Sequence, residues 1–344
     1  QYGQSNSYTR DNSFTISQSF AFPTVYINQS RLADAQIVSS EWQLKQTQLE
    51  MATHVKQLYW QWVYLWSKYK LLMYQDSLFS GFARAAALRA RSGETNRLEM
   101  ISARSQSLEI KNQIQQVTAD LSICHQKLQT VVHLRQPLIP ADTVLFRISG
   151  TSWNDTTGLS DNPAASYAHQ QIEIARLEVK VENSKMLPDF SIGYFSQTMQ
   201  GIQDIGGVPR AFGSGDRFTG FQAGISLPLW FTPHVSRARA ARIRQQAAQI
   251  SAGYYSESLL GQYQTLLAEL SKHNTTLAYY EEQAVPEAGL IIDQATRSYK
   301  AGALDYLDYI LTLNRALSIR HNYLDALNDF NQTIISLEFV TGKI

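Results

Sequence analysis

The stretch that decides the fold is Tyr299-Lys300-Ala301-Gly302-Ala303-Leu304-Asp305-Tyr306-Leu307-Asp308. It is a single glycine-centred turn between two long segments with helix-like sequence. A similar turn occurs much earlier, in residues 91–99, around Gly93. The sequence therefore predicts a mainly α fold with a small β part. Two long antiparallel helical hairpins, each folded back at one glycine, are expected to form a coiled-coil-like rod with both tips at the same end.

The predicted helices are far longer than an ordinary globular helix. Residues 31–92 contain one breaker, Gly81, while residues 96–136 and 303–341 contain neither Gly nor Pro. Residues 235–301 are also predicted to be helical, with a kink at Pro286. At 1.5 Å per residue, a helix of about 60 residues reaches roughly 90 Å, so the tips are expected to lie far from the strands.

Short strands alternate with the helices. Residues 1–29 are predicted as strand, because even positions from Phe14 onward are mostly large and apolar while odd positions are small or polar. Residues 190–230 are predicted as a β-hairpin with a long, flexible, glycine-rich loop. The residues predicted to share an apolar, membrane-facing side of these strands are Phe14, Ile16, Phe20, Phe22, Phe221, Ile225, Leu227 and Trp230.

The order strand, long helix, glycine turn, long helix occurs twice, which is an internal two-fold repeat. The first half-repeat is predicted over residues 1–140 and contains the Gly93 tip. An irregular segment follows over residues 141–163. The second half-repeat covers residues 164–344 and contains a helix, the β-hairpin, a long helix, the Gly302 tip and a return helix.

Nothing else in the sequence is predicted to cover the apolar strand face. Lipid would cover it, and symmetric copies would close the open edges of so few strands. Aromatic residues near the strand ends suit the girdles of an outer-membrane barrel. A soluble sandwich with an aromatic core is the alternative. The small polar residues on the opposite face favour the barrel, because a barrel lumen is polar.

Composition excludes several classes of function. The net charge is +1 and no basic tract could neutralise a row of phosphates, so nucleic acid is not expected as a partner. The single cysteine, Cys124, cannot form an internal disulfide and is predicted to be a packing residue. Seven scattered histidines give no ligand spacing, and no phosphate-binding loop or nucleophile motif is present. We therefore expect no enzyme activity, no cofactor and no metal site.

No apolar run is long enough for a transmembrane helix, and no signal peptide is visible. The chain starts at Gln1 within what is predicted to be a strand. We therefore expect that an export signal precedes this sequence.

Several motifs, in their order and spacing, resemble the outer-membrane efflux protein family, the TolC-like channels. Asn162-Pro163 opens a helix that ends at residues 187–190, Leu-Pro-Asp-Phe, and residues 225–229, Ile-Ser-Leu-Pro-Leu, lead into an Ala- and Arg-rich helix. The other matching segments are Val285-Pro286, residues 299–302 with Leu307-Asp308, and Leu337-Glu338 with Gly342. The likeness covers essentially the whole chain. Residues 22–26, Phe-Pro-Thr-Val-Tyr, resemble the heavy-metal cation branch.

The resemblance implies a homotrimer in the outer membrane of a Gram-negative bacterium. Each protomer would give four strands to one twelve-stranded transmembrane barrel, with a periplasmic helical tube below it. The tips would meet the periplasmic adaptor of a tripartite pump that contains an inner-membrane RND-type transporter. The implied function is a passive export duct for metal cations or small toxic compounds. The family's first long helix would precede residue 1.

The tips are the predicted functional sites. Gly93 and Gly302 permit a positive φ in a tight helix–helix turn. The residues predicted to contact the adaptor at these tips are Gly93, Leu98, Gly302, Leu304 and Tyr306. The alternative is that these side chains only close the ends of the coiled coil.

Asp305 and Asp308 begin the last helix, where carboxylates stabilise the positive helix end. A second hypothesis is that three symmetric copies form an acidic ring that selects cations. Such a ring would gate through pairs with Arg297 or Lys300. Two alternatives to the channel remain open: a non-channel helical scaffold that spans the periplasm, and the pump adaptor itself.

Overall fold

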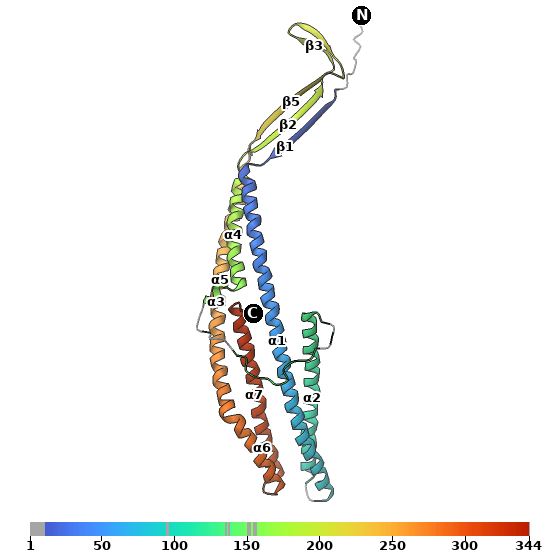
Figure 1. Cartoon of the computed structure of the whole chain (residues 1–344), viewed down its shortest axis with the longest axis vertical. Helices are drawn as coiled ribbons and strands as arrows, with labels where there is room; N and C mark the ends of the chain where they lie inside the picture. The colour runs from blue at the N-terminus through green and yellow to red at the C-terminus, as the bar shows by residue number, and fades with distance from the viewer. Residues whose placement is uncertain are drawn as a thin grey trace. The chain divides into compact units, whose positions relative to one another are not determined.

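The computed structural model describes residues 11–93, 96–134, 136, 138–149, 153 and 157–343 (Figure 1). The chain divides into two compact units. The strand-bearing unit comprises residues up to Trp42 and residues Tyr167–Tyr254. The helical unit comprises Gln43–Ser166 and the chain from Tyr255 onward. Each unit is described by itself below, and the chain as a whole is mainly helical.

The strand-bearing unit contains a three-stranded antiparallel sheet in the order β1 (Ser13–Phe20), β2 (Asp189–Thr198), β5 (Arg217–Ser226). The register aligns side chains in rows across the strands. One such row is Ile16, Tyr194 and Phe221, and another is Phe20, Phe190 and Ile225. Because neighbouring side chains alternate between faces, these rows lie on the same side of the sheet.

The predicted strand limits are wrong in two places. Phe22 lies between β1 and the next helix, and Leu227 and Trp230 follow β5, so none of the three is in a strand. Pro23 starts the helix α1 (Pro23–Arg91), eight residues before the predicted start. Proline suits the first helical position because its missing N–H has no intrahelical partner there. The first turn of α1 contains a hydrogen bond from the N–H of Val25 to the carbonyl of Phe22, at 2.8 Å.

The predicted flexible loop contains a second, two-stranded hairpin. Strands β3 (Gly201–Ile205) and β4 (Val208–Phe212) pair antiparallel. Gly206 and Gly207 form the turn, with φ of 66° and 87°. A two-residue hairpin turn of type I′ requires positive φ at both central residues. This pair of glycines therefore forms a tight turn and not a flexible loop.

Parts of three helices complete the strand-bearing unit: the start of α1, α4 (Pro163–Ser184) from Tyr167 onward, and α5 (Thr232–Tyr279) up to Tyr254. The rest of α1 and of α5 belongs to the helical unit. Side-chain hydrogen bonds join α1 to α4. The amide of Asn28 donates to Ser184 Oγ at 2.7 Å, and Gln171 donates to Ser39 Oγ at 2.8 Å. Polar pairs at such close range fix the register of two packed helices.

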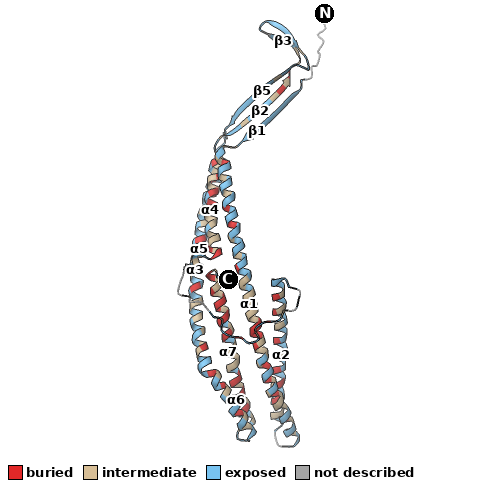
Figure 2. Ribbon diagram, viewed as in Figure 1, coloured by how far each residue is buried: buried red, intermediate tan, exposed pale blue. Residues whose placement is uncertain are grey.

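The helical unit adds α2 (Arg97–Val132), α3 (Thr157–Ser160), a π-helical turn η1 (Tyr280–Ala284), α6 (Val285–Lys300) and α7 (Tyr306–Val340). Much of α7 is buried, as its red and tan segments in Figure 2 show. The aromatic residues within residues 59–69 of α1 pack into the main apolar cluster. Cys124 is buried in the same cluster.

The predicted kink at Pro286 takes the form of the π-helical turn η1. The N–H of Val285 donates to the carbonyl of Tyr280, five residues back. Proline cannot donate to the residue four before it, and its ring crowds that carbonyl. Widening the preceding turn relieves this crowding, which is a known cause of helix bends.

A strap of irregular chain, residues 138–149, is tied to the helical unit by a buried amide. Asn331 is fully buried in α7. Its Oδ1 accepts from the N–H of Ile148 at 3.0 Å, and its Nδ2 donates to the carbonyl of Phe146 at 2.8 Å. Leu145 N–H donates to Ser67 Oγ of α1 at 2.9 Å. The strap is neither helix nor strand, so these side chains provide hydrogen-bond partners for its backbone N–H and carbonyl groups.

Polar contacts join α1 to α7 in the helical unit. The hydroxyl of Tyr64 donates to Asp325 at 2.6 Å, and Lys68 donates to the Tyr64 oxygen at 3.2 Å. Gln75 Nε2 lies 2.8 Å from His321 Nε2. Burial lowers the pKa of His321, and the positive charge of Lys68 lowers it further, against the opposing effect of Asp325. The neutral imidazole is therefore the favoured form in the folded chain.

Candidate functional site

The Gly302 turn ends α6, and two N–H groups that follow the helix donate to carbonyls of its last turn. Gly302 has a φ of 75° and its N–H donates to the carbonyl of Tyr299 at 3.1 Å. The N–H of Ala303 donates to the carbonyl of Ser298 at 2.9 Å. This pair of bonds is the Schellman motif, which needs a left-handed residue after the helix end. Glycine adopts that conformation without a Cβ penalty.

The Gly93 turn also contains a glycine with positive φ. Gly93 has a φ of 76° after the end of α1 at Arg91. Helices α2 and α7 then begin at Arg97 and Tyr306. The separation of these two starts equals that of Gly93 and Gly302, so the repeat predicted from the sequence extends to the helix boundaries.

Two polar side chains cap the helices that leave the turns. Asn96 Oδ1 accepts from the N–H of Leu98 at 3.0 Å at the start of α2. Asp305 Oδ1 accepts from the N–H of Asp308 at 2.8 Å at the start of α7. Each cap satisfies a backbone donor that has no intrahelical partner. Asp305 therefore has a structural role at the helix N-terminus, which was the simpler of its two predicted roles.

Aromatic and charged contacts join the two hairpins close to the turns. Tyr299 of α6 stacks on Tyr309 of α7, with ring centroids 4.7 Å apart and planes at 24°. Phe82 of α1 contacts both rings, at 5.4 and 4.7 Å between centroids. Arg89 donates to the Tyr299 hydroxyl at 3.3 Å and lies 3.8 Å from a carboxylate oxygen of Glu99. The α1–α2 and α6–α7 hairpins are thus held together at their ends.

Two hollows open between the hairpins at these ends, and together we call them the tip groove. The first, of about 370 Å³, lies between the starts of α2 and α7 and is lined by Asn96, Leu98, Glu99, Ser102, Gln106, Asp305, Tyr306, Leu307 and Ile310. The second, of about 560 Å³, is more polar and is lined by Arg89, Asn96, Glu99, Tyr299, Lys300, Gly302, Leu304, Asp305 and Tyr306. The first offers an apolar surface and the second offers both signs of charge.

Tyr306 belongs to both hollows and is electrostatically unusual. Its hydroxyl oxygen is buried and has no hydrogen-bond partner among the described residues. Burial, followed by the negative charge of Glu99 and the neighbouring Tyr299, raises the pKa of Tyr306 to about 12. The phenol therefore stays protonated and keeps a free donor in the groove at neutral pH.

The structure brings most of the predicted tip residues together. Leu98 and Tyr306 line the first hollow, and Gly302, Leu304 and Tyr306 line the second. Gly93 lines neither of these hollows. Leu304 is half-buried against the apolar cluster around Tyr309, whereas Leu98 is 67% exposed. Leu98 is therefore freer to meet a partner than Leu304.

The predicted gate residues surround the same turn. Asp305 and Asp308 are exposed at the start of α7, and Arg297 and Lys300 lie in the last turn of α6. Within the described part of the chain, no ion pair joins either cation to either carboxylate. The cations instead stabilise the negative helix end, where their placement is favourable.

Sequence reasoning missed four lining residues that matter, Arg89, Asn96, Glu99 and Tyr299. The repeat contained a signal for two of them. Applying the spacing of Gly93 and Gly302 pairs Asn96 with Asp305, and Glu99 with Asp308. The contact between Arg89 and Tyr299 crosses the two hairpins and has no counterpart in local sequence.

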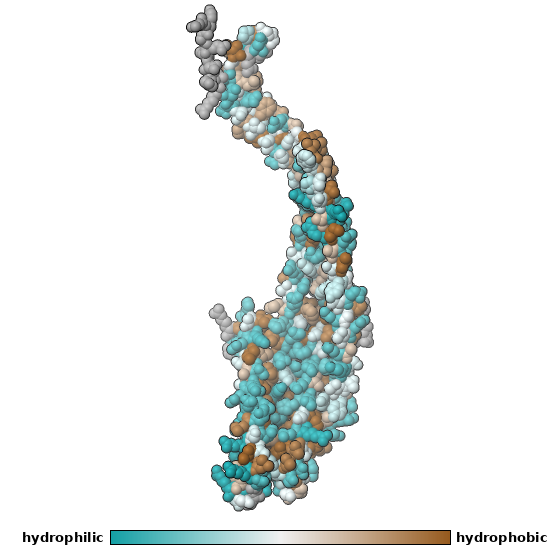
Figure 3. Space-filling model, turned by 180° about the vertical axis from the view of Figure 1, so that it is seen from behind, coloured by the Kyte–Doolittle hydropathy of each residue, from teal (hydrophilic) through white to brown (hydrophobic). Residues whose placement is uncertain are grey.

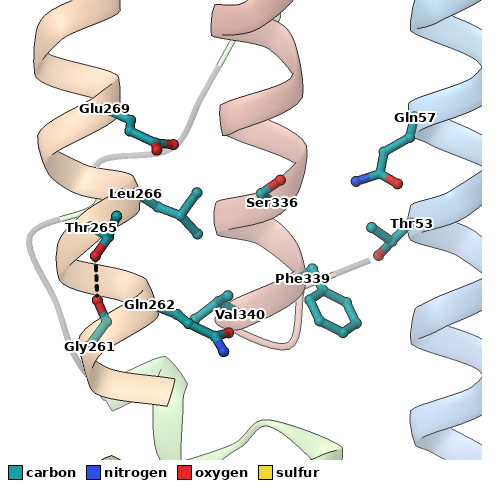
Figure 4. A pocket seen from close by; sticks show the side chains of 10 residues that line it. All are labelled: Thr53, Gln57, Gly261, Gln262, Thr265, Leu266, Glu269, Ser336, Phe339 and Val340. Atoms are coloured by element: carbon teal, nitrogen blue, oxygen red, sulfur yellow. Dashed lines mark hydrogen bonds between the residues drawn. The ribbon is translucent and has the colours of Figure 1, made fainter. Parts of the chain in front are cut away.

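A third hollow of about 480 Å³ lies among α1, α5 and α7, away from the turns (Figure 4). Leu266, Phe339 and Val340 give it an apolar part, and Glu269 is its charged residue. Thr265 points along its own helix and donates to the carbonyl of Gly261 at 2.9 Å. None of the predicted site residues lines this hollow.

The order of elements and the paired tips match a known family. The profile of the family described as outer membrane efflux protein matches residues 157–343, which is more than half of the chain. The chain belongs to the outer membrane efflux protein family. The family is one of efflux channels, not of enzymes.

Several solved structures, among them outer-membrane proteins, share the fold of this chain. The similarity to CusC has a TM-score of 0.79 at 14% identity and covers 97% of this chain and 83% of CusC. VceC from Vibrio cholerae gives 0.76 at 16% identity, with coverage of 96% and 79%. The open state of MtrE from Neisseria gonorrhoeae gives 0.75 at 16%, with coverage of 97% and 80%. At such low identity these likenesses establish the fold alone. No curated protein sequence matches the chain.

Proposed function

We propose that this chain is the outer-membrane channel component of a tripartite efflux pump. In this role it is a passive export duct that spans the outer membrane and the periplasm. The observation that carries the proposal is the two-faced sheet of the strand-bearing unit, in a chain of the outer membrane efflux protein family.

One face of the sheet is apolar and exposed. Phe221 is 89% exposed, Ile225 is 68% exposed and Ile16 is 58% exposed. Burying a side chain of this size away from water gains about 1.5–3 kcal/mol, so this much apolar surface is costly to leave in water. Among the described helices, none is both long and apolar enough to cross a membrane.

The opposite face is small and mostly polar. The aligned rows there include Ser17, Gly193 and Gln222, and Ser19, Ser191 and Gly224. Two large residues, Phe195 and Phe218, also lie on this face. Phe195 lies over Gly220, where an added Cβ would come within 2.7 Å of the ring. A sheet with lipid on the apolar face and water on the polar face fits this division.

The sheet edges support assembly from several copies. Among the described residues, β1 and β5 each pair with β2 alone, which leaves one edge of each strand open. Open edges are closed in a barrel, and cyclic symmetry closes it with identical interfaces. We propose a homotrimer in which each protomer contributes its strands to one transmembrane barrel, with the helices extending into the periplasm.

Paired cysteine variants test which face meets lipid. In a Cys124→Ser background, the full chain carries one labelled cysteine at Ile16 or Phe221, or at the neighbouring Ser17 or Gln222. After reconstitution, a spin-labelled lipid tail should quench a fluorophore at Ile16 and Phe221 and leave Ser17 and Gln222 largely unaffected. Equal quenching at all four positions, or none, would contradict the channel and favour a helical scaffold or a pump adaptor.

The tip groove is the proposed docking site for the periplasmic adaptor, which links the channel to an inner-membrane RND-type transporter. Leu98 and Leu307 expose 67% and 63% of their surfaces beside the groove. Replacing both by Glu should abolish export in cells and leave the conductance of the purified channel unchanged. Ile123→Glu, on the exposed middle of α2, is the matched control and should leave export intact.

Asp305 and Asp308 are the proposed cation-selecting ring, with Arg297 and Lys300 as their gating partners. The ring requires symmetric copies, since a single chain shows no pair between these groups in its described residues. The proposed cargo is metal cations or small toxic compounds, and the heavy-metal proposal rests on the resemblance of residues 22–26. Export assays with a series of metal salts and organic toxins would identify it.

A further inference from the structure

The start of α5 carries an unbalanced positive charge. Four arginines lie within eight residues, Arg237, Arg239, Arg242 and Arg244, and all four are exposed. No Asp or Glu occurs anywhere from residue 217 to residue 256. The chain as a whole has a net charge of only +1, so this segment departs strongly from the rest.

The arginines have little compensation within the structure. Arg244 lies 3.9 Å from Glu178 of α4, at the outer limit of an ion pair, and 62% of its side chain is exposed. Arg237, Arg239 and Arg242 form no ion pair with any described residue. The guanidinium groups of these three arginines are therefore available to an external anion.

The helix packs through other residues. Ala238 and Ala241 are buried at 3% and 0% exposure, and they form the stripe that faces the neighbouring helices. At 100° per residue along α5, Arg239 lies far from this stripe, whereas Arg242 flanks it on one side and Arg237 and Arg244 flank it on the other. The charges therefore surround the outer surface of the helix start.

An exposed apolar segment directly precedes the arginines. Leu229, Trp230 and Phe231 connect β5 to α5 and are 83%, 84% and 51% exposed. Trp is enriched where a membrane meets water, because its ring is apolar and its N–H is polar. On the face shown in Figure 3, hydrophobic residues gather where the strands give way to helices, and hydrophilic residues follow on the adjoining helices.

The three parts follow the polarity profile of one lipid leaflet. The apolar sheet face suits the hydrocarbon, the Leu-Trp-Phe segment suits the interface, and the arginines begin about 8 Å along α5 from its first residue. Arginine matches the oxygens of a phosphate group with two parallel hydrogen bonds. Each basic residue near an anionic membrane surface contributes about 1 kcal/mol, which corresponds to about a fivefold gain in binding.

We propose that the start of α5 binds the phosphodiester headgroups of anionic phospholipids, in the leaflet that adjoins the helices, through Arg237, Arg239, Arg242 and Arg244. This proposal rests on the proposed function, since it requires the sheet to lie in a membrane. The bound lipids set the depth of the barrel by anchoring it on its helical side.

The test measures binding of fluorescent phosphatidylglycerol to the detergent-solubilised full chain. Replacing all four arginines by Gln should weaken binding at least tenfold, and four Arg→Lys changes should retain most of it. Fluorescent phosphatidylcholine should show no such difference. Binding of phosphatidylglycerol should also weaken as salt rises, because the contact is electrostatic. The matched control replaces three exposed arginines of the tip, Arg91, Arg97 and Arg104, by Gln and should leave binding unchanged.

Three outcomes would overturn the proposal: equal affinity of the Gln variant and the wild type, equal loss in the tip control, or displacement by inorganic phosphate at concentrations equal to those of the lipid. Circular dichroism of the Gln variant checks that it is folded, and the Lys variant provides a second folded comparison. Insertion is read separately by quenching at Ile16 and Phe221. Insertion without lipid preference contradicts the headgroup site alone, whereas failure to insert contradicts the channel.

Discussion

Asn96 and Asp305 cap the first turns of α2 and α7, and both line the same two hollows of the tip groove. They occupy matching positions after Gly93 and Gly302 in the internal repeat. Two helix N-termini therefore open toward one groove. Asn96 and Asp305 therefore each cap a helix and also line the proposed docking surface.

Removing either cap should destabilise the helical unit. Asn96→Ala and Asp305→Ala each leave a first-turn N–H without its side-chain acceptor, and each should lower the free energy of unfolding by about 1 kcal/mol. Asn96→Asp and Asp305→Asn should be nearly neutral, because both residue types cap well. Urea unfolding followed by circular dichroism measures this. Asn112→Ala is the control, because Asn112 is exposed and lies far from both ends of α2. A comparable loss of stability in this variant would contradict the capping explanation.

Alanine substitutions of glycine should have opposite signs at the turn and in the helix. Gly302→Ala forces a Cβ into a backbone with φ of 75° and should cost about 1–2 kcal/mol. Gly81→Ala, inside α1 with nothing within 4 Å of the added Cβ, should stabilise by about 0.5–1 kcal/mol. Thermal unfolding of the two variants gives the comparison. Equal effects of the same sign would show that the left-handed turn is not what Gly302 provides.

The buried amide of Asn331 should contribute more to the free energy of unfolding than a hydrogen bond on the surface does. Asn331→Ala leaves the N–H of Ile148 and the carbonyl of Phe146 unpaired and should cost about 2–4 kcal/mol. Hydrogen exchange at Ile148 should accelerate because the strap is released. Asn322→Ala, exposed on the same helix, should change stability by less than about 0.5 kcal/mol. Unchanged exchange at Ile148 in Asn331→Ala would mean that the strap is held by its apolar contacts instead.

His321 should make the helical unit less stable in mild acid. Its folded pKa is lowered by burial and by Lys68, so the unfolded chain binds the proton more readily. The stabilisation is fully present above the unfolded value of about 6.5 and is lost as the pH falls below it. His321→Gln should therefore show a flatter dependence of unfolding free energy on pH in this range. Identical slopes in the two proteins would contradict this assignment.

The sequence predicted the features that depend on local signals and missed those that depend on contacts across elements. Gly302 and Gly93 were identified because helix breakers are rare in these long segments. The predicted start of α1 is too late because the strand prediction extends to residue 29, whereas Pro23 favours a first helical turn. The hairpin β3–β4 was missed because glycines mark both loops and tight turns.

The candidate site was predicted in part for the same reason. Leu98 and Tyr306 flank the glycines and were found by proximity in sequence. Arg89 and Tyr299 meet across two hairpins, where Phe82 also packs against Tyr299 and Tyr309. The buried polar pair of Asn331 with the strap likewise joins residues about 185 positions apart, which no sequence period reveals.

The charge ring is tested by variants that keep the cap and remove the charge. Asn caps a helix as well as Asp does, so Asp305→Asn with Asp308→Asn should keep the cap and lower the free energy of unfolding by about 1 kcal/mol or less, from the lost charges at the helix N-terminus. The same double variant should lose cation selectivity, because the carboxylates that attract cations are gone. Unchanged selectivity in the folded double variant would exclude these residues from the permeation path.

Single-channel recording of the full chain in planar lipid bilayers distinguishes an export duct from a helical scaffold. We expect discrete conductance steps that favour cations over anions. Inserted protein that gives no discrete conductance would contradict an export duct and leave a helical scaffold as the better description.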